Sequence, residues 1–455
     1  MTNFEKWQSY MSGISSPQNF VDWTWYYIIG AALQRRVWCG PVGQECFPNK
    51  YVILVGDPGI GKGLCIRPAS EFLSHWKLKD AVSKAEEIQD PQRRAKAIAT
   101  INNDNLRAQE EEMQPTNRQN NVIESQIIPV AADATTYEAL IRAVGKSYRT
   151  IEYPLFNKEK NVIESKIYGH SSLCFSLQEL SSLLRKRSDD TVNYMLGLFD
   201  CPLNYEYDTK TKGKDRVRRG CLNLLAGTTS SFMRSTFDEK LVNEGWTSRT
   251  FYIYASKNRF NKFFIPSLSE AQHGYKKDLL DHILALTTLY GHVEVSQETE
   301  AFLQDWWNEQ ENNKDKRKNK SLRLVPYYSR KNIHVMKMAM AFHFSESLEL
   351  KIPLETFQKA IAFVDREEVN MHYAITFQAT NNIARISDKI VEILKHTGKQ
   401  SFIDLLSSEE IYTIGKRQEV EEALTFLKET EKIGPIEIIE DDVTGDKTAY
   451  YSLPK

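Results

Sequence analysis

A short apolar strand followed by a glycine-rich turn constrains the fold of this chain more than any other feature. Tyr51–Val55 is a continuous apolar run, typical of a strand buried on both faces of a parallel sheet. Residues 56–62 read Gly-Asp-Pro-Gly-Ile-Gly-Lys and match the pattern G-x-x-x-x-G-K, with a helix expected to begin near Lys62. Glycines let backbone N–H groups turn inward at a helix N-terminus. Strand, turn and helix together therefore predict a site for the phosphates of a nucleotide.

The predicted loop defines a set of nucleotide-binding residues: Gly56, Asp57, Pro58, Gly59, Ile60, Gly61, Lys62 and Gly63. We expect Lys62 to reach the β- and γ-phosphates of ATP. The position after the lysine, where a Ser or Thr hydroxyl usually binds Mg²⁺, is Gly63. The sequence therefore predicts ATP and Mg²⁺ as cofactors, with the metal held through water, and leaves the rate of hydrolysis open.

Two further predicted strands end in polar residues. Ser172–Leu177 is followed by Gln178 and Glu179. Glu179 stands where a general base would activate water, although an ordinary acid at a helix N-terminus is the alternative. Gln178 occupies the position where an Asp is usual, which weakens the expected metal site. The next predicted strand, over 221–226, is followed by Gly227, Thr228 and Thr229. The two threonines would either orient the attacking water or cap the following helix.

Apolar strands alternate with helices over 51–260, which implies an α/β fold with a mostly parallel sheet and helices on both faces. An N-terminal helical segment, 1–50, precedes this core. Within the core, 74–120 is highly charged and is expected to form a helical insertion. Residues 261–380 read as helical throughout. Residues 385–455 read as three helices and a β-hairpin, the pattern of a winged helix.

Finer expectations concern individual elements. We expect a helix buried on one face over 17–38, a short strand over 127–130 and a hairpin over 149–170.

A second predicted hairpin, over 204–219, carries concentrated positive charge. The whole chain has 59 Lys+Arg against 60 Asp+Glu, so any nucleic-acid surface must be local. Residues 210–219 hold six basic groups and one acid. Such a hairpin would grip DNA phosphates without reading bases, or would be a solvated turn. The candidate DNA-binding residues are Lys210, Lys212, Lys214 and Arg216. A second cluster, 314–323, also holds six basic residues and one acid, and is expected to be a charged loop.

The chain shows no sign of secretion, membrane insertion or metal ligation by cysteine. Its six cysteines have neither CxxC nor Cys/His ligand spacing, so we expect reduced thiols and no metal cluster. We find no signal peptide and no apolar run approaching about 20 residues. No membrane partner is expected, and the predicted location is the cytoplasm.

Several motifs occur in an order that resembles minichromosome maintenance helicases. Residues 56–62 resemble their phosphate loop, and Gly245–Phe251 resembles their Ser-Arg-Phe arginine-finger element. Tyr328–Asn332 resembles the start of their sensor-2 helix, and a basic hairpin before the sensor-1 strand is the pore device of that family and of small-virus helicases. Over about 17–380 the chain is similar to helicase-like, primase-associated ATPases of phages and plasmids, which share its Asp-Ala-Thr segment at 133–135.

The resemblance implies an AAA+ P-loop NTPase core, then an all-α lid and a C-terminal winged helix. It implies a homo-oligomeric ring, expected to be a hexamer, with ATP between subunits and single-stranded DNA in a central channel. Arg249 would complete the neighbour's site as an arginine finger, and Arg330 would be the sensor-2 arginine. The alternative for Arg249 is a pair with an acid such as Glu244. The implied function is an ATP-dependent DNA helicase, translocase or replication initiator of a phage or mobile element in a bacterial cell.

Two other functions remain open at this point. One is a non-helicase AAA+ ATPase, such as a helicase loader or a defence or packaging switch, that remodels a protein partner. The other is a small-molecule kinase, suggested by Gly-Lys-Gly. Residues 385–455 hold 10 Lys+Arg and 15 Asp+Glu, a net charge of about -5. Lys416 and Arg417 begin the candidate recognition helix of this acidic module, which would dock DNA or a replication protein.

Overall fold

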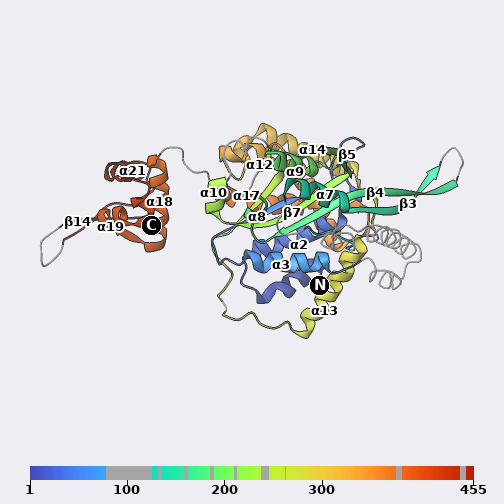
Figure 1. Ribbon diagram of the computed structural model, residues 1–455, viewed down its shortest axis with the longest axis horizontal. Helices are drawn as coiled ribbons and strands as arrows, with labels where there is room; N and C mark the ends of the chain where they lie inside the picture. Colours follow the sequence, from blue (N-terminus) through green and yellow to red (C-terminus); the bar gives the residue numbers. More distant parts are fainter. Residues whose placement is uncertain are drawn as a thin grey trace. The chain divides into compact units, whose positions relative to one another are not determined.

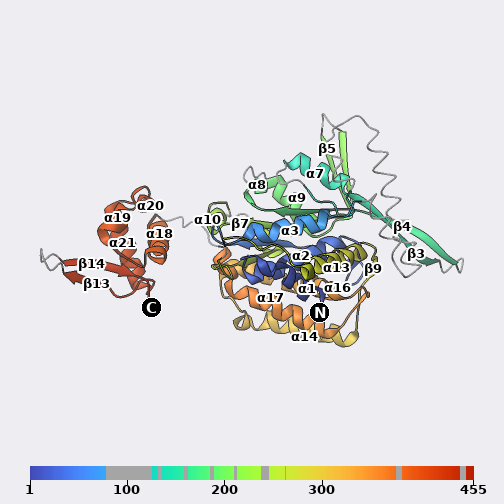
Figure 2. The same ribbon diagram turned by 90° about the horizontal axis from the view of Figure 1, so that it is seen from below.

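The computed structural model divides the chain into two compact units, Met1–Thr376 and Phe377–Lys455 (Figures 1 and 2). The charged insertion expected over 74–120 lies outside the described residues from position 78 onward, as does the Asp-Ala-Thr segment up to Thr135. The described residues are 1–77, 126–131, 136–157, 162–184, 189–209, 213–236, 245–261, 263–375, 382–440 and 447–454.

A five-stranded sheet forms the centre of the first unit, in the order β3-β4-β7-β2-β8. Neighbouring strands are parallel except for β3, which runs antiparallel to β4. The strands are β2 (Tyr51–Val55), β3 (Tyr148–Asn157), β4 (Val162–Leu177), β7 (Gly220–Thr228) and β8 (Thr250–Tyr254). Every residue of β2 and β7 is buried, as expected for the middle of a sheet covered on both faces. The predicted α/β fold with a mostly parallel sheet is confirmed.

Strand β4 is longer than predicted. The expected hairpin over 149–170 and the expected strand over 172–177 share one continuous strand of 16 residues. Its first part pairs with β3 and its last part with β7, and the β3–β4 hairpin extends away from the sheet in both views (Figures 1 and 2). The strand predicted over 127–130 is wrong. Only Val130 pairs with β4, through an isolated bridge to Cys174, because Pro129 beside it has no N–H to donate to a longer ladder.

Helices cover both faces of the sheet (Figure 2). Helix α3 (Lys62–Ser74) lies on the face where a Cβ on Gly227 would meet Ile66. Helix α9 (Asp189–Phe199) lies on the opposite face, where the Tyr51 hydroxyl donates to the Met195 carbonyl over 2.5 Å. Sheet and helices therefore form three layers.

Helix α2 (Gln18–Leu33) lies on the same face as α3 and is the centre of the core. It was expected to be buried on one face. Instead it is buried on every side from Phe20 to Leu33, because α1 (Asn3–Tyr10), α3 and two later helices all pack against it.

A fully buried lysine lies beneath α2. Lys50 Nζ donates to the carbonyl oxygens of Tyr26 and Pro48, each over 3.0 Å. Burial, with a smaller contribution from the nearby Lys337 charge, lowers the pKa of Lys50 to about 7. Only neutral oxygens accept its hydrogen bonds, so the interior disfavours the charged form.

The region after β8 is largely helical, as predicted. Helix α16 packs against α2, and α17 packs against β8, so these helices close the core directly. The helices are α13 (Glu270–Leu286), α14 (Gln297–Asn312), α15 (Val325–Tyr328), α16 (Lys331–Glu346) and α17 (Leu354–Ala374). Two parallel strand pairs were not predicted, because two-residue strands show no readable alternation. They are β1 (Val37–Trp38) with β9 (Gly291–His292), and β10 (Glu294–Val295) with β11 (Lys351–Ile352).

Shorter elements connect the sheet strands. A separate antiparallel hairpin, β5 (Asn204–Thr209) and β6 (Gly213–Arg218), confirms the one predicted over 204–219. The other elements are η1 (Met11–Gly13), α7 (Tyr137–Lys146), α8 (Ser181–Leu184), α10 (Ser230–Thr236), α12 (Trp246–Arg249), η2 (Lys314–Lys316) and η3 (Leu322–Leu324).

The second unit has its own small core, which includes Ile386, Leu405 and Leu424. Four helices pack with a three-stranded antiparallel sheet of order β12-β14-β13. The sequence predicted three helices and the final hairpin; it missed β12 and the division of the second helix into α19 and α20. The elements are α18 (Asn382–Thr397), β12 (Lys399–Ser401), α19 (Phe402–Ser407), α20 (Glu409–Tyr412), α21 (Arg417–Glu429), β13 (Glu437–Glu440) and β14 (Lys447–Ser452).

Candidate functional site

The glycine-rich turn joins the centre of the sheet to a helix N-terminus. Strand β2 ends at Val55 and α3 begins at Lys62. Gly59 and Gly61 have φ angles of 84° and 93°, in the left-handed region that favours glycine. The first N–H groups of α3 have no acceptor within the helix and carry the positive end of its dipole. The turn therefore has the backbone shape and the electrostatics of an anion-binding loop.

Lys62 folds over this turn. Its side chain is mostly buried, and Nζ donates to the carbonyl oxygens of Gly56, over 2.6 Å, and Asp57, over 2.9 Å. Burial lowers the pKa of Lys62, while the nearby carboxylates of Glu179 and Asp57 act in the opposite direction. The only cation of the loop thus lies inside it, with Glu179 close enough to affect its charge.

Three parallel strands end at the edge of the sheet that carries the turn. Val55 of β2 pairs with Thr228 of β7, and Leu177 of β4 pairs with Ala226 of β7. Strand β7 therefore lies between the strand that carries the turn and the strand that leads to Glu179. Gln178 and Glu179 are exposed just beyond β4. The structure brings Glu179, Thr228 and Lys62 to one edge, as parallel strands require.

The two threonines after β7 differ in their surroundings. Thr229 Oγ1 accepts a hydrogen bond from the Phe232 N–H over 3.1 Å and caps α10. Thr228 Oγ1 is buried and has no hydrogen-bond partner within the described part of the chain. Of the two predicted roles, helix capping belongs to Thr229, whereas Thr228 retains an unused polar atom beside the turn.

Arg249 lies at the opposite end of the parallel strands, where β2 and β8 begin. It ends α12, and the next residue, Thr250, pairs with Tyr51, the first residue of β2. The five residues of β2 separate this end from the turn, a distance of about 16 Å at 3.3 Å per residue. The backbone of Arg249 therefore lies at the other end of the strands from the glycine-rich turn of its own chain.

Arg249 and Arg330 bind one carboxylate, Asp200. Asp200 Oδ2 accepts from Arg249 Nη2 over 2.6 Å and from Nε over 3.2 Å, and Oδ1 accepts from Arg330 Nη1 over 2.8 Å. Burial by itself would raise the pKa of Asp200, but the two guanidinium groups outweigh it and lower the pKa. The alternative partner proposed for Arg249, Glu244, lies outside the described residues.

Sequence reasoning missed Asp200, because it lies 49 and 130 residues from its two partners. It also missed His334 of α16, whose Nε2 bonds to the Ser248 carbonyl oxygen over 3.0 Å. Burial is the main cause that lowers the pKa of His334 to about 3, so the ring is neutral and donates this bond. His334 thereby fixes the short helix that ends at Arg249. Neither residue lies in a motif, so no local signal could have identified it.

The basic hairpin is present, and two of the four candidate DNA-binding residues belong to its described strands. Lys210 and Lys212 are outside the described residues, and Lys214 belongs to β6. Arg216 is exposed and pairs with Glu206 across the hairpin, with Nε 3.1 Å from Oε1. Part of its charge is thus neutralised within the hairpin.

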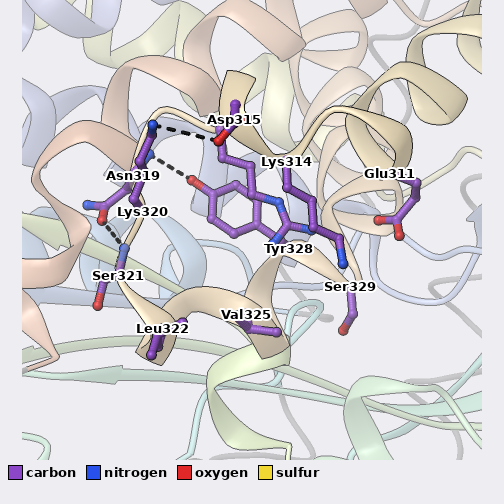
Figure 3. Close-up of a pocket in the computed structure, with 11 residues that line it drawn as sticks. Glu311, Lys314, Asp315, Asn319, Lys320, Ser321, Leu322, Val325, Tyr328 and Ser329 are labelled. Carbon is purple, nitrogen blue, oxygen red and sulfur yellow. Dashed lines mark hydrogen bonds and ion pairs between the residues drawn. The ribbon is translucent and has the colours of Figure 1, made fainter.

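The second basic cluster, residues 314–323, contributes to a cleft of about 470 Å³ (Figure 3). The Arg317 guanidinium lies 4.6 Å from the ring centre of Tyr328. Lys320 Nζ lies 3.8 Å from Asp315 Oδ1. Acidic and basic side chains alternate in the lining, which fits the charged loop expected from the sequence.

Comparisons with known proteins add no family assignment. No protein-family model matches this chain, and no curated protein matches it.

The chemistry of the described side chains sets further limits. All six cysteines are unbonded thiols, as predicted. No cluster of three or more His, Cys, Asp or Glu side chains suited to a metal occurs among the described residues. Each helix in the described ranges is too short or too polar to cross a bilayer. The strand ends around Lys62 and the arginine pair at Asp200 are the two polar sites that support a functional proposal.

Proposed function

We propose that this chain is an ATPase of the AAA+ type that works as a ring and moves or opens DNA. One observation carries the proposal. The phosphate-loop turn, Glu179 and Thr228 share one edge of a parallel sheet, while two arginines meet at the other edge. A single chain thus has half of an ATP site at each edge, and subunits packed edge to edge would complete the sites between them.

The phosphate-loop edge supports binding and water activation. Lys62 would exchange its two carbonyl acceptors for the β- and γ-phosphate oxygens, which a cation satisfies better than neutral carbonyls do. Glu179 is exposed and lies near Lys62, so its carboxylate is available to accept a proton from the attacking water. The buried Thr228 hydroxyl has no partner among the residues described and is available to orient that water.

Mg²⁺ bound with ATP would neutralise charge on the phosphates. The residues near the loop that offer oxygen atoms fit such a metal only in part. Position 63 has no hydroxyl, and the exposed oxygen-bearing side chains just beyond β4 are Gln178 and Glu179.

The arginine edge supports action on a neighbouring subunit. Asp200 accepts hydrogen bonds from both Arg249 and Arg330 and so holds the two guanidinium groups beside one carboxylate. The Asp200 side chain is 44% exposed and that of Arg249 14%, so Arg249 would have to exchange Asp200 for a phosphate of the neighbouring subunit. A neighbour's γ-phosphate would bring negative charge to this pair, as an arginine finger requires. A hexameric ring is the assembly we propose.

DNA is the proposed substrate because of the basic hairpin, β5–β6, since residues 210–219 hold six basic groups and one acid. A ring would gather the hairpins in a central channel, where they would contact single-strand phosphates. The four helices and the three-stranded sheet of the second unit support the proposal of a winged helix. Its Arg417 pairs with Glu421 over 3.1 Å, so part of the charge at the start of α21 is neutralised, and the unit would dock DNA or a replication protein.

The test uses the full chain in ATPase and strand-displacement assays on a forked DNA duplex. We expect ATP hydrolysis that DNA stimulates, and displacement that Lys62→Ala abolishes. If neither the wild type nor Lys62→Ala hydrolyses ATP, the proposal of an ATPase is refuted. Hydrolysis without displacement would instead favour the non-helicase ATPase that remodels a protein partner, which the acidic second unit also fits.

A further inference from the structure

The side chain of Gln178 lies against the first turn of α3. A Cβ atom placed on Gly63 would lie 3.2 Å from Gln178 Oε1 and 3.8 Å from its Cδ. Gly63 directly follows Lys62 in α3, and Gln178 directly follows β4. The two positions at which this chain departs from the usual phosphate-binding pattern are therefore neighbours in space.

The backbone does not require glycine at position 63. Gly59 and Gly61 have left-handed φ angles, whereas Gly63 is helical and is not among the residues with positive φ. A serine would fit the backbone there. What limits its side chain is the Gln178 oxygen, because a 3.2 Å contact to Cβ is tighter than ordinary van der Waals contact. The absence of a side chain at Gly63 leaves room for this carboxamide.

The carboxamide oxygen has suitable chemistry for the position it occupies. In the usual pattern a Ser or Thr hydroxyl, one bond beyond Cβ, offers its oxygen to Mg²⁺. Gln178 Oε1 lies next to the same Cβ position, and Gln178 is an exposed residue. Carboxamide oxygens are ligands for hard cations, and they add no negative charge beside a triphosphate. The adjacent Glu179 then keeps its carboxylate for water.

We propose that the Gln178 carboxamide oxygen replaces the missing Ser or Thr hydroxyl as the protein ligand for the Mg²⁺ that accompanies ATP. This inference rests on the proposed ATP binding and names the residue that holds the metal. It treats Gly63 and Gln178 as one paired change, in which the oxygen moves from the helix to the end of the neighbouring strand. The two departures from the usual pattern, at Gly63 and Gln178, then leave the chain with a protein ligand for the metal.

The test removes the Gln178 oxygen and places a hydroxyl oxygen at position 63 instead. A fluorescent ATP analogue is titrated into the full chain with Mg²⁺ and with EDTA, and Mn²⁺ binding in the presence of ATP is followed by electron paramagnetic resonance. Gln178→Leu keeps a side chain of similar volume but removes the oxygen, and should reduce the metal-dependent gain in affinity by about tenfold or more. Its affinity in EDTA should not change. Adding Gly63→Ser to Gln178→Leu should restore the gain and the Mn²⁺ signal.

The matched control is Gln304→Leu, on the exposed surface of α14, which should leave both readouts unchanged. A full metal-dependent gain in Gln178→Leu would overturn the inference, and so would failure of Gly63→Ser to restore it. A different result marks failure of the ATP site itself: wild type and Lys62→Ala would then bind the analogue equally weakly in Mg²⁺ and in EDTA.

Discussion

Replacing Arg249 by Ala separates an effect on the neighbour's ATP from an effect on the chain's own ATP. The length of β2 separates the backbone of Arg249 from the glycine-rich turn of its own chain by about 16 Å. At that distance two unit charges interact by about 1 kcal/mol at an effective dielectric constant near 20. Screening over roughly two Debye lengths reduces this to about 0.1 kcal/mol. The mutant should therefore bind ATP with less than about a twofold change in Kd.

Turnover should respond very differently. An arginine that neutralises charge on a transferring phosphoryl group contributes about 10³-fold or more to kcat, which corresponds to about 4 kcal/mol of barrier. Loss of the Arg249–Asp200 pair has a smaller cost, about 1–2 kcal/mol of stability, because Arg330 still binds Asp200 and the carboxylate is partly exposed. Arg249→Ala should thus fold and bind ATP but hydrolyse it very slowly.

Two controls decide whether the loss is catalytic. Asp200→Asn weakens the same ion pair but keeps both guanidinium groups, so its turnover should fall by less than that of Arg249→Ala. Arg249→Ala mixed with Lys62→Ala should regain hydrolysis, because some interfaces combine an intact loop with an intact arginine. The reasoning is refuted if Asp200→Asn loses turnover as fully as Arg249→Ala does, or if mixed rings form and show only the sum of the two mutant rates.

Three further predictions address other parts of the molecule. Lys62→Ala should lose ATP binding, whereas Glu179→Gln should bind ATP and lose turnover, since only water activation is removed; wild-type hydrolysis in Glu179→Gln would place the general base elsewhere. Lys210→Ala combined with Lys212→Ala should lower the slope of log affinity for DNA against log salt by about 0.7–0.9 for each phosphate that the hairpin no longer binds, and an unchanged slope would show that these lysines do not touch DNA. Lys50 has a pKa of about 7 in the fold and about 10.4 when unfolded, so the folded state binds fewer protons across this window. Wild-type stability should rise with pH relative to Lys50→Met between these values, as measured by urea unfolding at pH 7 and 9, and parallel pH profiles would contradict it.

Secondary structure was predicted correctly where the residues of a single short segment determine it. The strand Tyr51–Val55, the turn that follows it and the start of α3 at Lys62 were predicted correctly. Each depends on short-range chemistry: continuous apolar residues, glycines at left-handed positions, and a helix after a tight turn. The hairpin over 204–219 was equally clear, because alternation and a turn are local properties.

Elements that depend on their neighbours were less predictable. Helix α2 was expected to expose one face, but its surroundings bury it all round, and no helix shows in its own sequence how many others will pack on it. The strand expected over 127–130 is reduced to one bridge at Val130. Pairing of a strand is a property of two segments and of the hydrogen bonds both can supply.

The sequence by itself determined the glycine loop, the buried strands and the concentration of basic residues, because these arise from residues adjacent in the chain. Only the tertiary structure decided that Asp200 binds both Arg249 and Arg330, and that Gln178 lies against Gly63. It also assigned helix capping to Thr229 and left Thr228 Oγ1 unpartnered within the described residues. The physical reason is the same in each case. Charge pairing, close packing and hydrogen bonding act between atoms that the folded sheet brings together, whatever their separation along the chain.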